Sequence, residues 1–366
     1  MGDVLHTVTF GVIAYNEHNY LPDLLTDLLN QTYPKELTEV LLVDGESTDD
    51  TWQIMRDFQR SYGAIYKNVL LLKNPKRVQP AGWNIVIKHF TSDILLRIDA
   101  HARVPGDFIE KNIGCINSGE YVCGGPRENI IDEDTPWKRM LLSAEQSMFG
   151  SGIASYRNKT DERKYVKSVF HGAYRREVIN RVGLFNEELI RTEDNEYHYR
   201  IREAGYQICY DPAIRSQYQT RSSLGRMIRQ KYQNGLWIGK TLFVCPGCIS
   251  IFHLVPAAFV MALIAGALFG FYGSWKPLFV LGIVYGLFLL VSTAESIIKS
   301  GNYLDVVLSA VIVIIHISYG TGIIVGCIEM VYARIKEKVV RGGGSEEVDN
   351  FADIVALCPL WTGAAA

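Results

Sequence analysis

LLRIDAHARVP, residues 95–105, starts as an apolar strand and ends in charged and polar side chains. Asp99 closes the apolar run and His101 follows two residues later, so in an extended segment both side chains point the same way. One carboxylate and one imidazole at this spacing suit Mn²⁺ or Mg²⁺ bridging a diphosphate, with a nucleotide completing the shell. The alternative is an acidic strand end that caps the following turn.

The first hundred residues alternate between strand and helix patterns. Apolar strand patterns cover 6–17, 38–52, 68–75 and 93–102, and helical patterns lie between them at 19–34, up to about residue 60, and at 79–90. This alternation predicts right-handed crossovers and an α/β fold with a parallel, doubly wound sheet. Ligands bind such sheets beyond the carboxyl ends of the strands. Polar residues gather at those ends: Asn16 with Glu17, Asp44, and Asp99 with His101.

Two further acidic segments are candidates for the same site. Asp44 lies in VDGESTDDT, where its carboxylate can accept an N–H from a nucleobase edge, form an Asx turn with Gly45 and Ser47, or do both. Glu193 and Asp194 precede a helical pattern and can stabilise the amino terminus of that helix. The functional alternative makes one of them a general base, because a hydroxyl acceptor must lose its proton as it attacks.

Beyond residue 242 the chain becomes strongly apolar. The first of three stretches, 249–271, is long enough to span a bilayer of about 30 Å, and 277–294 is near the lower limit. The third, 303–331, contains polar residues and glycines that predict a kinked or partly re-entrant segment. We expect a globular domain over 1–242, a membrane region of about three apolar segments over 243–335, and a flexible tail over 336–366. The alternative is that these segments are three strongly apolar helices in the core of a soluble protein.

The segment 222–240 carries four Lys and Arg residues beside apolar ones. It is predicted to form an amphipathic helix on an anionic membrane surface, and a plain solvated face is the alternative. Three crossings would place the basic segment 332–341 on the far side of the membrane from the first domain. Because Lys and Arg favour the cytosolic side, the third apolar stretch is either re-entrant or interfacial, or it overrides that tendency.

Composition excludes some classes of function. The formal net charge of −2 gives no basis for nucleic-acid binding. Seven cysteines form no paired framework, and Cys245-Pro-Gly-Cys248 has no second pair with zinc-site spacing, so reduced thiols are preferred over a redox role. Residues 1–10 lack the pattern of a cleaved signal peptide.

Several motifs in order resemble the inverting, GT-A-type nucleotide-sugar glycosyltransferases of family 2. They are AYNE (14–17), VDGESTDDT (43–51), DAHA (99–102), and TEDNE (192–196) followed by RIREAGY (200–206). NPKRVQPAGWN, IDAHARVP, GGPR, HGAYRREVINRVGLFNEEL and HISYGTG resemble the succinoglycan-biosynthesis-like branch, over roughly residues 7–330. The resemblance implies a Rossmann-like, mostly parallel GT-A catalytic domain followed by transmembrane helices. It also implies a multi-pass protein of the inner or plasma membrane with a cytosolic catalytic domain.

The resemblance also implies roles for individual residues. The donor, a UDP-sugar, would be bound by Ala14, Tyr15, Glu17, Asp44, Arg77 and Asp99, with Asp44 at the uracil and Glu17 at the nucleoside. Asp99 and His101 would hold the metal, Asp194 would be the base, and Glu193 would shape its environment. Gln233 and Trp237 would contact the acceptor, although Trp237 equally fits an interfacial anchor.

Two departures from the family pattern refine the expected function. The metal motif ends here in His101, and Leu236 replaces the arginine of the QxxRW element of processive synthases, which favours addition of one sugar. We expect a metal-dependent enzyme that adds one hexose, with glucose preferred, to a polyprenyl-diphosphate-linked oligosaccharide in exopolysaccharide or cell-surface glycan synthesis. The alternatives are a polyprenyl-phosphate sugar synthase and a non-catalytic membrane scaffold with a sugar-nucleotide fold.

Overall fold

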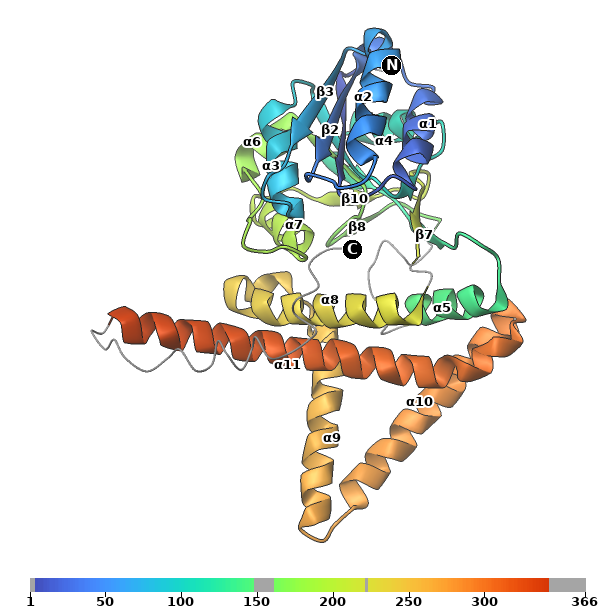
Figure 1. Cartoon of the computed structure of the whole chain (residues 1–366), viewed down its shortest axis with the longest axis vertical. Helices are drawn as coiled ribbons and strands as arrows, with labels where there is room; N and C mark the ends of the chain where they lie inside the picture. The colour runs from blue at the N-terminus through green and yellow to red at the C-terminus, as the bar shows by residue number, and fades with distance from the viewer. Residues whose placement is uncertain (1–3, 148–160, 221–222, 342–366) are drawn as a thin grey trace.

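The structure is a computed structural model that describes residues 4–147, 161–220 and 223–341. Figure 1 shows three levels along its long axis. A globular α/β domain lies above a layer of helices, and a helical hairpin projects from that layer. The layer consists of α5 (Pro136–Gln146), α8 (Leu224–Val244) and α11 (Leu308–Arg341), and the hairpin consists of α9 (Val255–Phe271) and α10 (Lys276–Ser300).

The globular domain is built on a mostly parallel sheet, as the sequence predicts. Within the described residues its strand order is β3-β2-β1-β4-β9-β6-β10-β8. β9 runs antiparallel to both of its neighbours and β8 is antiparallel to β10, while the other pairs are parallel. The strands are β1 (Val8–Ala14), β2 (Thr38–Asp44), β3 (Asn68–Lys73), β4 (Ile94–Asp99), β6 (Val122–Gly124), β8 (Lys164–Val166), β9 (Gly172–Arg175) and β10 (Ile208–Tyr210).

Helices cover both faces of this sheet. One apolar core lies between the sheet and α1 (Leu21–Leu29), α2 (Thr51–Tyr62) and α4 (Phe108–Asn117). The other lies against α3 (Gln79–His89), α6 (Arg176–Val182) and α7 (Glu193–Glu203). A small sheet of β5 (Ala102–Arg103), β11 (Ser216–Gln219) and β7 (Arg127–Ile130) stands beside the end of β4.

The alternation of side chains along β4 decides which of its residues face the first core, against α1, α2 and α4, and which face the second core, against α3, α6 and α7. Leu96 and Ile98 belong to the first core, whereas Leu95 belongs to the second. Because successive side chains of a strand point to opposite faces, Arg97 and Asp99 lie on the same side as Leu95, toward α3 and α7. A charged pair on the inner strand β4 therefore points at the helix that begins with Glu193.

Two expectations about the carboxyl-terminal part are wrong. The third apolar stretch is a short 3₁₀ turn, Tyr303–Val307, followed by one continuous helix without a re-entrant break. Its glycines do not kink it, because they lie where the backbones of other helices approach closely. Residues 336–341, expected to belong to a flexible tail, are helical instead: α11 continues to Arg341, since residues 332–341 contain no Gly or Pro. The rest of the expected tail, 342–366, lies outside the described residues.

Candidate active site

The loops that follow the first three strands interlock at the carboxyl edge of the sheet. The backbone N–H of Asn16 donates to Ser47 Oγ (2.9 Å), and the Thr48 N–H donates to Asn16 Oδ1 (2.8 Å). Asn16, Glu46 and Arg77, one after each strand, adopt positive φ (54°, 59° and 56°), and no other non-glycine among the described residues does. Such backbone strain persists only where the surroundings enforce it, and it gathers at ligand sites. Arg77 donates twice to Glu46 Oε2 (3.0 and 2.7 Å).

Asp44 is fully buried at the end of β2, and its carboxylate already has partners. It accepts a hydrogen bond from the Ser47 N–H (3.2 Å) and forms an ion pair with Lys73 Nζ (2.7 Å). Lys73 lies over the ring of Trp52, 3.5 Å from its centroid. The Asp44 side chain therefore holds its own turn as expected, but through the N–H three residues on instead of the two of an Asx turn, while contact of Asp44 with a nucleobase stays a prediction. Ala14 pairs with Asp44 in the sheet, and the Ala14 carbonyl accepts the N–H of Gly45 (2.8 Å), which fixes the adjoining Tyr15 turn.

Asp99 ends β4, and His101 lies in the turn that follows rather than in the extended segment assumed from the sequence. His101 Nδ1 lies 3.0 Å from Glu17 Oε1, and the buried Nε2 has no hydrogen-bond partner among the described residues. Burial lowers the pKa of His101, but the hydrogen bond to Glu17 and the charges of Glu17 and Asp99 outweigh it and raise the pKa to about 9. At that pKa both ring nitrogens carry protons, so Nε2 would bind a metal only when the cation displaces its proton. A carboxylate on the opposite ring nitrogen is the usual arrangement for such a histidine.

A second histidine lies beside Asp99, and a tyrosine packs against His101. His171 Nε2 lies 3.9 Å from Asp99 Oδ2, and both ring nitrogens of His171 lack hydrogen-bond partners among the described residues. Burial lowers the pKa of His171 to about 3, so the ring is neutral. Tyr218 meets His101 edge-on with centroids 4.8 Å apart. The sequence reasoning did not assign a role to His171, although the motif HGAYRREV contains it.

The predicted acid pair sits in the first turn of α7, close to β4. Glu193 is 3% exposed, and its Oε2 has no partner among the described residues. Burial and the charge of Asp194 raise the pKa of Glu193 well above its ordinary value, and burial also raises the pKa of Asp194. Asp194 remains partly exposed, and its Oδ1 accepts the Asn195 N–H (2.8 Å). Their place at the helix start also suits the dipole, so the capping and functional interpretations hold together.

Arg97 is the charged residue that sequence reasoning missed. It is 5% exposed, and its guanidinium lies 4.7 Å from the Trp83 ring centroid and 4.8 Å from that of Phe185. Burial lowers its pKa, but the charges of Tyr174, Glu193, Asp194 and Asp99 outweigh this effect and raise it, so Arg97 stays cationic. Its Nε and Nη1 have no partners in the described part of the chain. An arginine inside the apolar run ILLRID, two residues before Asp99, was the available signal.

Buried hydrogen bonds fix α7 on both sides. His198, one turn after Asp194, contacts Tyr174 Oη through Nε2 (2.8 Å) and Ser168 Oγ through Nδ1 (2.9 Å). Burial lowers the pKa of His198 to about 3, which keeps this link neutral. At the helix start, Thr192 Oγ1 lies 2.5 Å from Thr241 Oγ1 of α8. The acid pair is thus held between the sheet and the helical layer.

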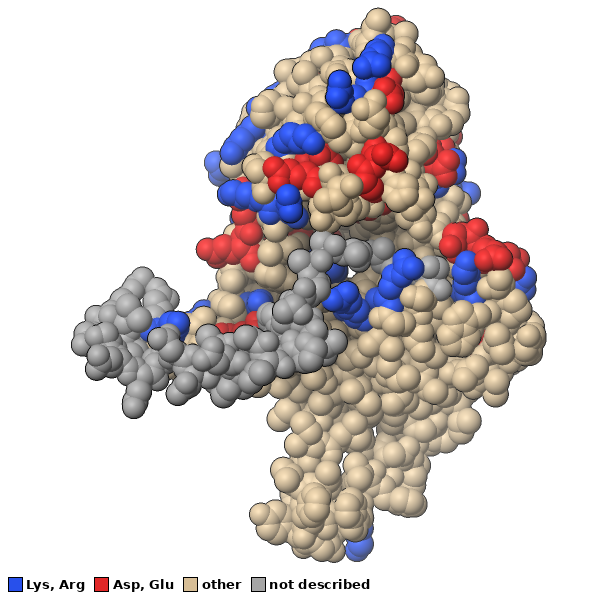
Figure 2. All heavy atoms as spheres, in the orientation of Figure 1, with Lys and Arg blue, Asp and Glu red and all other residues tan. Residues whose placement is uncertain are grey.

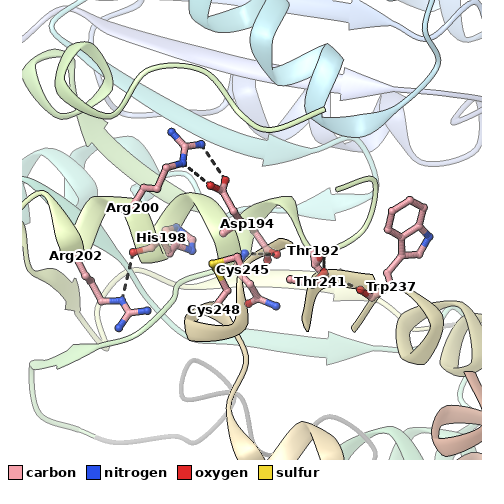
Figure 3. The surroundings of a disulfide bond; sticks show 11 residues. Thr192, Asp194, His198, Arg200, Arg202, Trp237, Thr241, Cys245 and Cys248 are labelled. Atoms are coloured by element: carbon pink, nitrogen blue, oxygen red, sulfur yellow. Dashed lines mark hydrogen bonds and ion pairs between the residues drawn. A yellow bond between two sulfur atoms is a disulfide. The ribbon is translucent and has the colours of Figure 1, made fainter. Parts of the chain in front are cut away.

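The predicted acceptor residues lie on α8, near this contact. Trp237 accepts a hydrogen bond at its carbonyl from Thr241 Oγ1 (2.7 Å), and Lys240 Nζ lies 4.8 Å from its ring centroid. Both Trp237 and Gln233 are partly exposed. Figure 3 shows Trp237, Thr241 and Thr192 in sequence, leading from α8 to the first turn of α7. The predicted roles of Trp237 and Gln233 in acceptor binding stay open.

The expectation of reduced thiols is wrong for one pair of cysteines. Cys245 and Cys248 form a disulfide where α8 gives way to α9, because the Pro-Gly turn returns the chain on itself. Figure 3 shows this disulfide beside α7. Four other cysteines, Cys115, Cys123, Cys209 and Cys327, are free thiols.

Comparison with known proteins agrees with this geometry. Residues 9–183 match the family described as Glycosyl transferase family 2. A Methanococcus voltae protein named dolichyl N-acetyl-alpha-D-glucosaminyl phosphate 3-beta-D-2,3-diacetamido-2,3-dideoxy-beta-D-glucuronosyltransferase is 27% identical over 86% of this chain and 96% of its own length. The succinoglycan biosynthesis protein ExoA of Rhizobium meliloti is 26% identical over 73% of this chain and 79% of its own.

A solved structure confirms the fold independently. The mannosyltransferase PcManGT of Pyrobaculum calidifontis, solved with GDP-Man and Mn²⁺, superposes with a TM-score of 0.55 at 17% identity, over 86% of this chain and 87% of its own. The strand order, the polar edge of the sheet and these matches lead to one conclusion. Residues 9–183 form a glycosyltransferase family 2 domain with a GT-A-like fold, and long apolar helices follow it in the chain.

Proposed function

We propose that the enzyme transfers one hexose, glucose in the first instance, from a UDP-sugar to a sugar hydroxyl of a polyprenyl-linked acceptor, with inversion and with the help of a divalent cation. The class of acceptor is supported by the names of relatives, which act on a dolichyl N-acetylglucosaminyl phosphate or in succinoglycan biosynthesis. A diphosphate link between lipid and glycan is the finer form of the proposal. The product would serve exopolysaccharide or cell-surface glycan synthesis.

The donor side of the proposed reaction lies at the ends of β1, β2 and β4. Asp99 and His101 Nε2 would hold Mn²⁺ or Mg²⁺, and they fit this role because Nε2 is buried, lacks a partner, and is oriented by Glu17. Among the described residues no group of three His, Cys, Asp or Glu side chains could hold a metal, so the donor's diphosphate would complete the shell. A bound cation supplies positive charge that stabilises the departing nucleoside diphosphate.

The remaining donor contacts would come from the interlocked loops. The strained turns at Asn16 and Arg77 bring backbone and guanidinium groups to the same edge, where Tyr15 and Arg77 would line the nucleotide pocket. Asp44 would reach the uracil only after a rearrangement of its turn, since its side chain is fully buried beside Ser47 and Lys73. Its proposed role can therefore be direct, or it can hold the loop that carries the base contact.

The acceptor side is carried by α7. The acceptor oxygen would attack the anomeric carbon as the bond from that carbon to the donor phosphate oxygen breaks, and Asp194 would take the hydroxyl proton. A raised pKa makes Asp194 a stronger base than an exposed aspartate, and the charge of Arg97 limits the rise. Glu193, more deeply buried, would shape the charge around Asp194 without contacting the acceptor.

One observation carries the proposal: the buried Arg97, two residues before Asp99 on β4, is close enough to Asp99 of the donor side and to Glu193 and Asp194 of the acceptor side for their charges to act on it. The direct test is a donor screen with purified enzyme in detergent. UDP release is measured with each of several UDP-sugars, with and without a synthetic polyprenyl-phosphate-linked or polyprenyl-diphosphate-linked sugar, in Mn²⁺, Mg²⁺ or chelator.

We expect release of UDP only when a lipid-linked sugar and a divalent cation are both present. Folded enzyme that releases no UDP with any pair of donor and acceptor would contradict the proposal. Transfer to a polyprenyl phosphate that carries no sugar would identify a polyprenyl-phosphate sugar synthase instead. Trp237→Ala should raise the acceptor KM severalfold and leave the donor KM unchanged. Trp137→Ala, at an exposed position near the start of α5, is the matched control and should change neither.

A further inference from the structure

α8 and α11 run side by side in the same direction with their backbones in close contact. A Cβ atom added to Gly235 of α8 would lie 2.1 Å from the carbonyl oxygen of Tyr319, and one on Gly239 would lie 2.3 Å from that of Ile323. In return, a Cβ on Gly326 of α11 would lie 2.2 Å from the carbonyl oxygen of Leu236. Small residues spaced four apart on both helices permit this approach. A crossing at a single point would not require it on successive turns.

The contact continues along the whole of α8. Near its start, Met227 packs in one apolar cluster with Leu308 and Ile312 of α11. Near its end, Lys240 forms an ion pair with Glu329 (2.8 Å), and Arg334 donates to the Phe243 carbonyl (2.7 Å). α11 therefore follows α8 from residue 308 to residue 334 and cannot be separated from it without exposing this interface.

α8 itself belongs to the underside of the catalytic domain. Besides the contact of Thr241 with Thr192, Lys231 forms an ion pair with Glu145 of α5 at 2.7 Å, and both side chains are buried. Removing one partner of a buried ion pair leaves the other charge buried and uncompensated, so the pair holds the two helices together. The contact of Thr241 with Thr192 thus ties α8 to the catalytic domain, and the ion pair of Lys231 ties it to α5. These contacts fix the direction of α8, and α11 shares it.

The beginning of α11 is tied to the same level. Asn302, in the turn after α10, donates to the Pro136 carbonyl of α5 (2.8 Å) and to Asp305 Oδ1 (2.9 Å). The fully buried Asp305 also accepts from Ser300 (2.9 Å), from Ser296, and from Ser143 of α5 (3.4 Å). The chain that leaves the layer through α9 has therefore returned to it at the end of α10.

Only the α9–α10 hairpin leaves the layer. The apolar helix that includes α9 spans Ile251–Phe271, 21 residues, and α10 has 25, which correspond to about 31 and 37 Å at 1.5 Å per residue. Both exceed the hydrocarbon thickness of about 30 Å. Their side chains are exposed: Leu268 is 54% and Leu290 67% accessible. Figure 2 shows this part of the visible face almost without charged side chains except at its tip.

We infer that the bilayer is crossed by α9 and α10 alone, and that α11 lies along the membrane surface beneath α8, although it is long and apolar enough to cross. Figure 1 shows α11 running across the ends of the hairpin helices, parallel to α8. The outer face of α11 would rest on the acyl chains through Ile314, Ile317, Ile328, Val331 and Ile335, which are 38–55% exposed.

This placement removes the conflict between topology and charge. With two crossings, the basic end of α11, including Arg334 and Lys336, stays on the same side as the catalytic domain. Lys and Arg near apolar segments favour the cytosolic side of the membrane. Two crossings therefore place the basic segment on the side that its charge favours, if the catalytic domain is cytosolic. At the hairpin tip the exposed Tyr272 and Trp275 suit the opposite membrane–water interface, where such rings concentrate.

The test is the sidedness of single cysteines in the full-length protein. Asp57→Cys marks the catalytic domain, Ser274→Cys the hairpin tip, and Ala333→Cys the end of α11; all three positions are at or near the surface. The background replaces Cys245, Cys248, Cys327 and Cys358. A membrane-impermeant maleimide is applied to sealed vesicles of known orientation.

We expect Asp57→Cys and Ala333→Cys to react from one side and Ser274→Cys from the other. Reaction of Ala333→Cys together with Ser274→Cys would show three crossings and overturn the inference. Reaction of all three from one side, with extraction by carbonate, would show that nothing crosses and would overturn it as well.

A cross-link checks the packing separately. Lys240→Cys with Glu329→Cys should join α8 to α11 in native membranes with a short bis-maleimide, because these side chains form an ion pair. Lys240→Cys with Ser274→Cys is the matched control and should not cross-link. Failure of the first pair, with both thiols reactive, would show that α11 has left α8 and would contradict the placement.

Discussion

Two buried acidic clusters in this chain differ in how completely their polar atoms are paired. Glu193 of the catalytic domain leaves Oε2 without a partner, and the nearby Arg97 leaves Nε and Nη1 without one among the described residues. Asp305, at the α10–α11 turn, is equally buried but accepts hydrogen bonds from Ser143, Ser296, Ser300 and Asn302.

This difference distinguishes a cluster that can bind a ligand or act in the reaction from one that only holds helices together. A buried polar group without a partner destabilises the fold, so it persists where a ligand completes its bonding or where its charge is used. A saturated cluster has no capacity left for a ligand, and it fixes the relative position of the elements that it joins. We therefore expect substitutions at the first cluster to act on the reaction and those at the second to act on stability.

The largest effect is expected at the proposed base. Asp194→Asn should lower kcat by about 10³-fold because general base catalysis contributes roughly 10²–10⁴, while the melting temperature changes little. Initial rates of UDP release with a lipid-linked sugar measure it. Glu203→Gln, an exposed acid at the other end of α7, is the matched control and should keep full activity. Unchanged kcat in Asp194→Asn would mean that the acceptor is already ionised, as a lipid phosphate is.

Replacement of the buried cation tests the first cluster as a unit. Arg97→Met should lower the free energy of unfolding by about 3 kcal/mol, because removing one partner of buried charges leaves the others uncompensated. Adding Glu193→Gln to Arg97→Met should restore part of that stability by removing one of the carboxylates, without restoring activity. Thermal unfolding in detergent measures both. If the double variant is no more stable than Arg97→Met, the carboxylates are not what Arg97 balances.

The saturated cluster should show the opposite pattern. Asp305→Ala should destabilise the protein by about 2 kcal/mol, since several donors lose a charged acceptor worth roughly 1–3 kcal/mol each and do so non-additively. The kcat of the folded fraction should stay within about twofold of the parent. Asp57→Asn, on the exposed surface of α2, is the control. A large loss of kcat with little loss of stability would assign Asp305 to the reaction.

The smallest effect is a pH dependence of stability. Burial raises the pKa of Glu193 above its ordinary 4.5, so the folded state keeps a proton that the unfolded state releases as the pH rises past 4.5. Stability therefore falls with rising pH in that window. Glu193→Gln should raise the free energy of unfolding by about 1 kcal/mol at pH 7.5 and change it little at pH 4. Equal effects at both pH values would mean that ionisation of Glu193 does not destabilise the folded state.

Much of the catalytic domain follows from local patterns. Apolar runs that end in Asp44 and Asp99 predicted β2 and β4. The order of strand and helix patterns along the chain can be read from short segments, and consecutive strand–helix–strand units form parallel pairs. The sequence alone therefore determined a mostly parallel sheet with a polar carboxyl edge. The same rules could have indicated Arg97, because it shares a face with Asp99.

Other features depended on contacts between residues far apart in the chain. The pairing of Thr192 with Thr241, the burial of Glu193 against Arg97, and the parallel packing of α8 on α11 join segments whose separation no local pattern encodes. From hydropathy alone, α11 is long and apolar enough to cross a membrane. Its direction was decided only by the tertiary structure, because glycines on two helices allow backbone contact that side-chain composition does not predict.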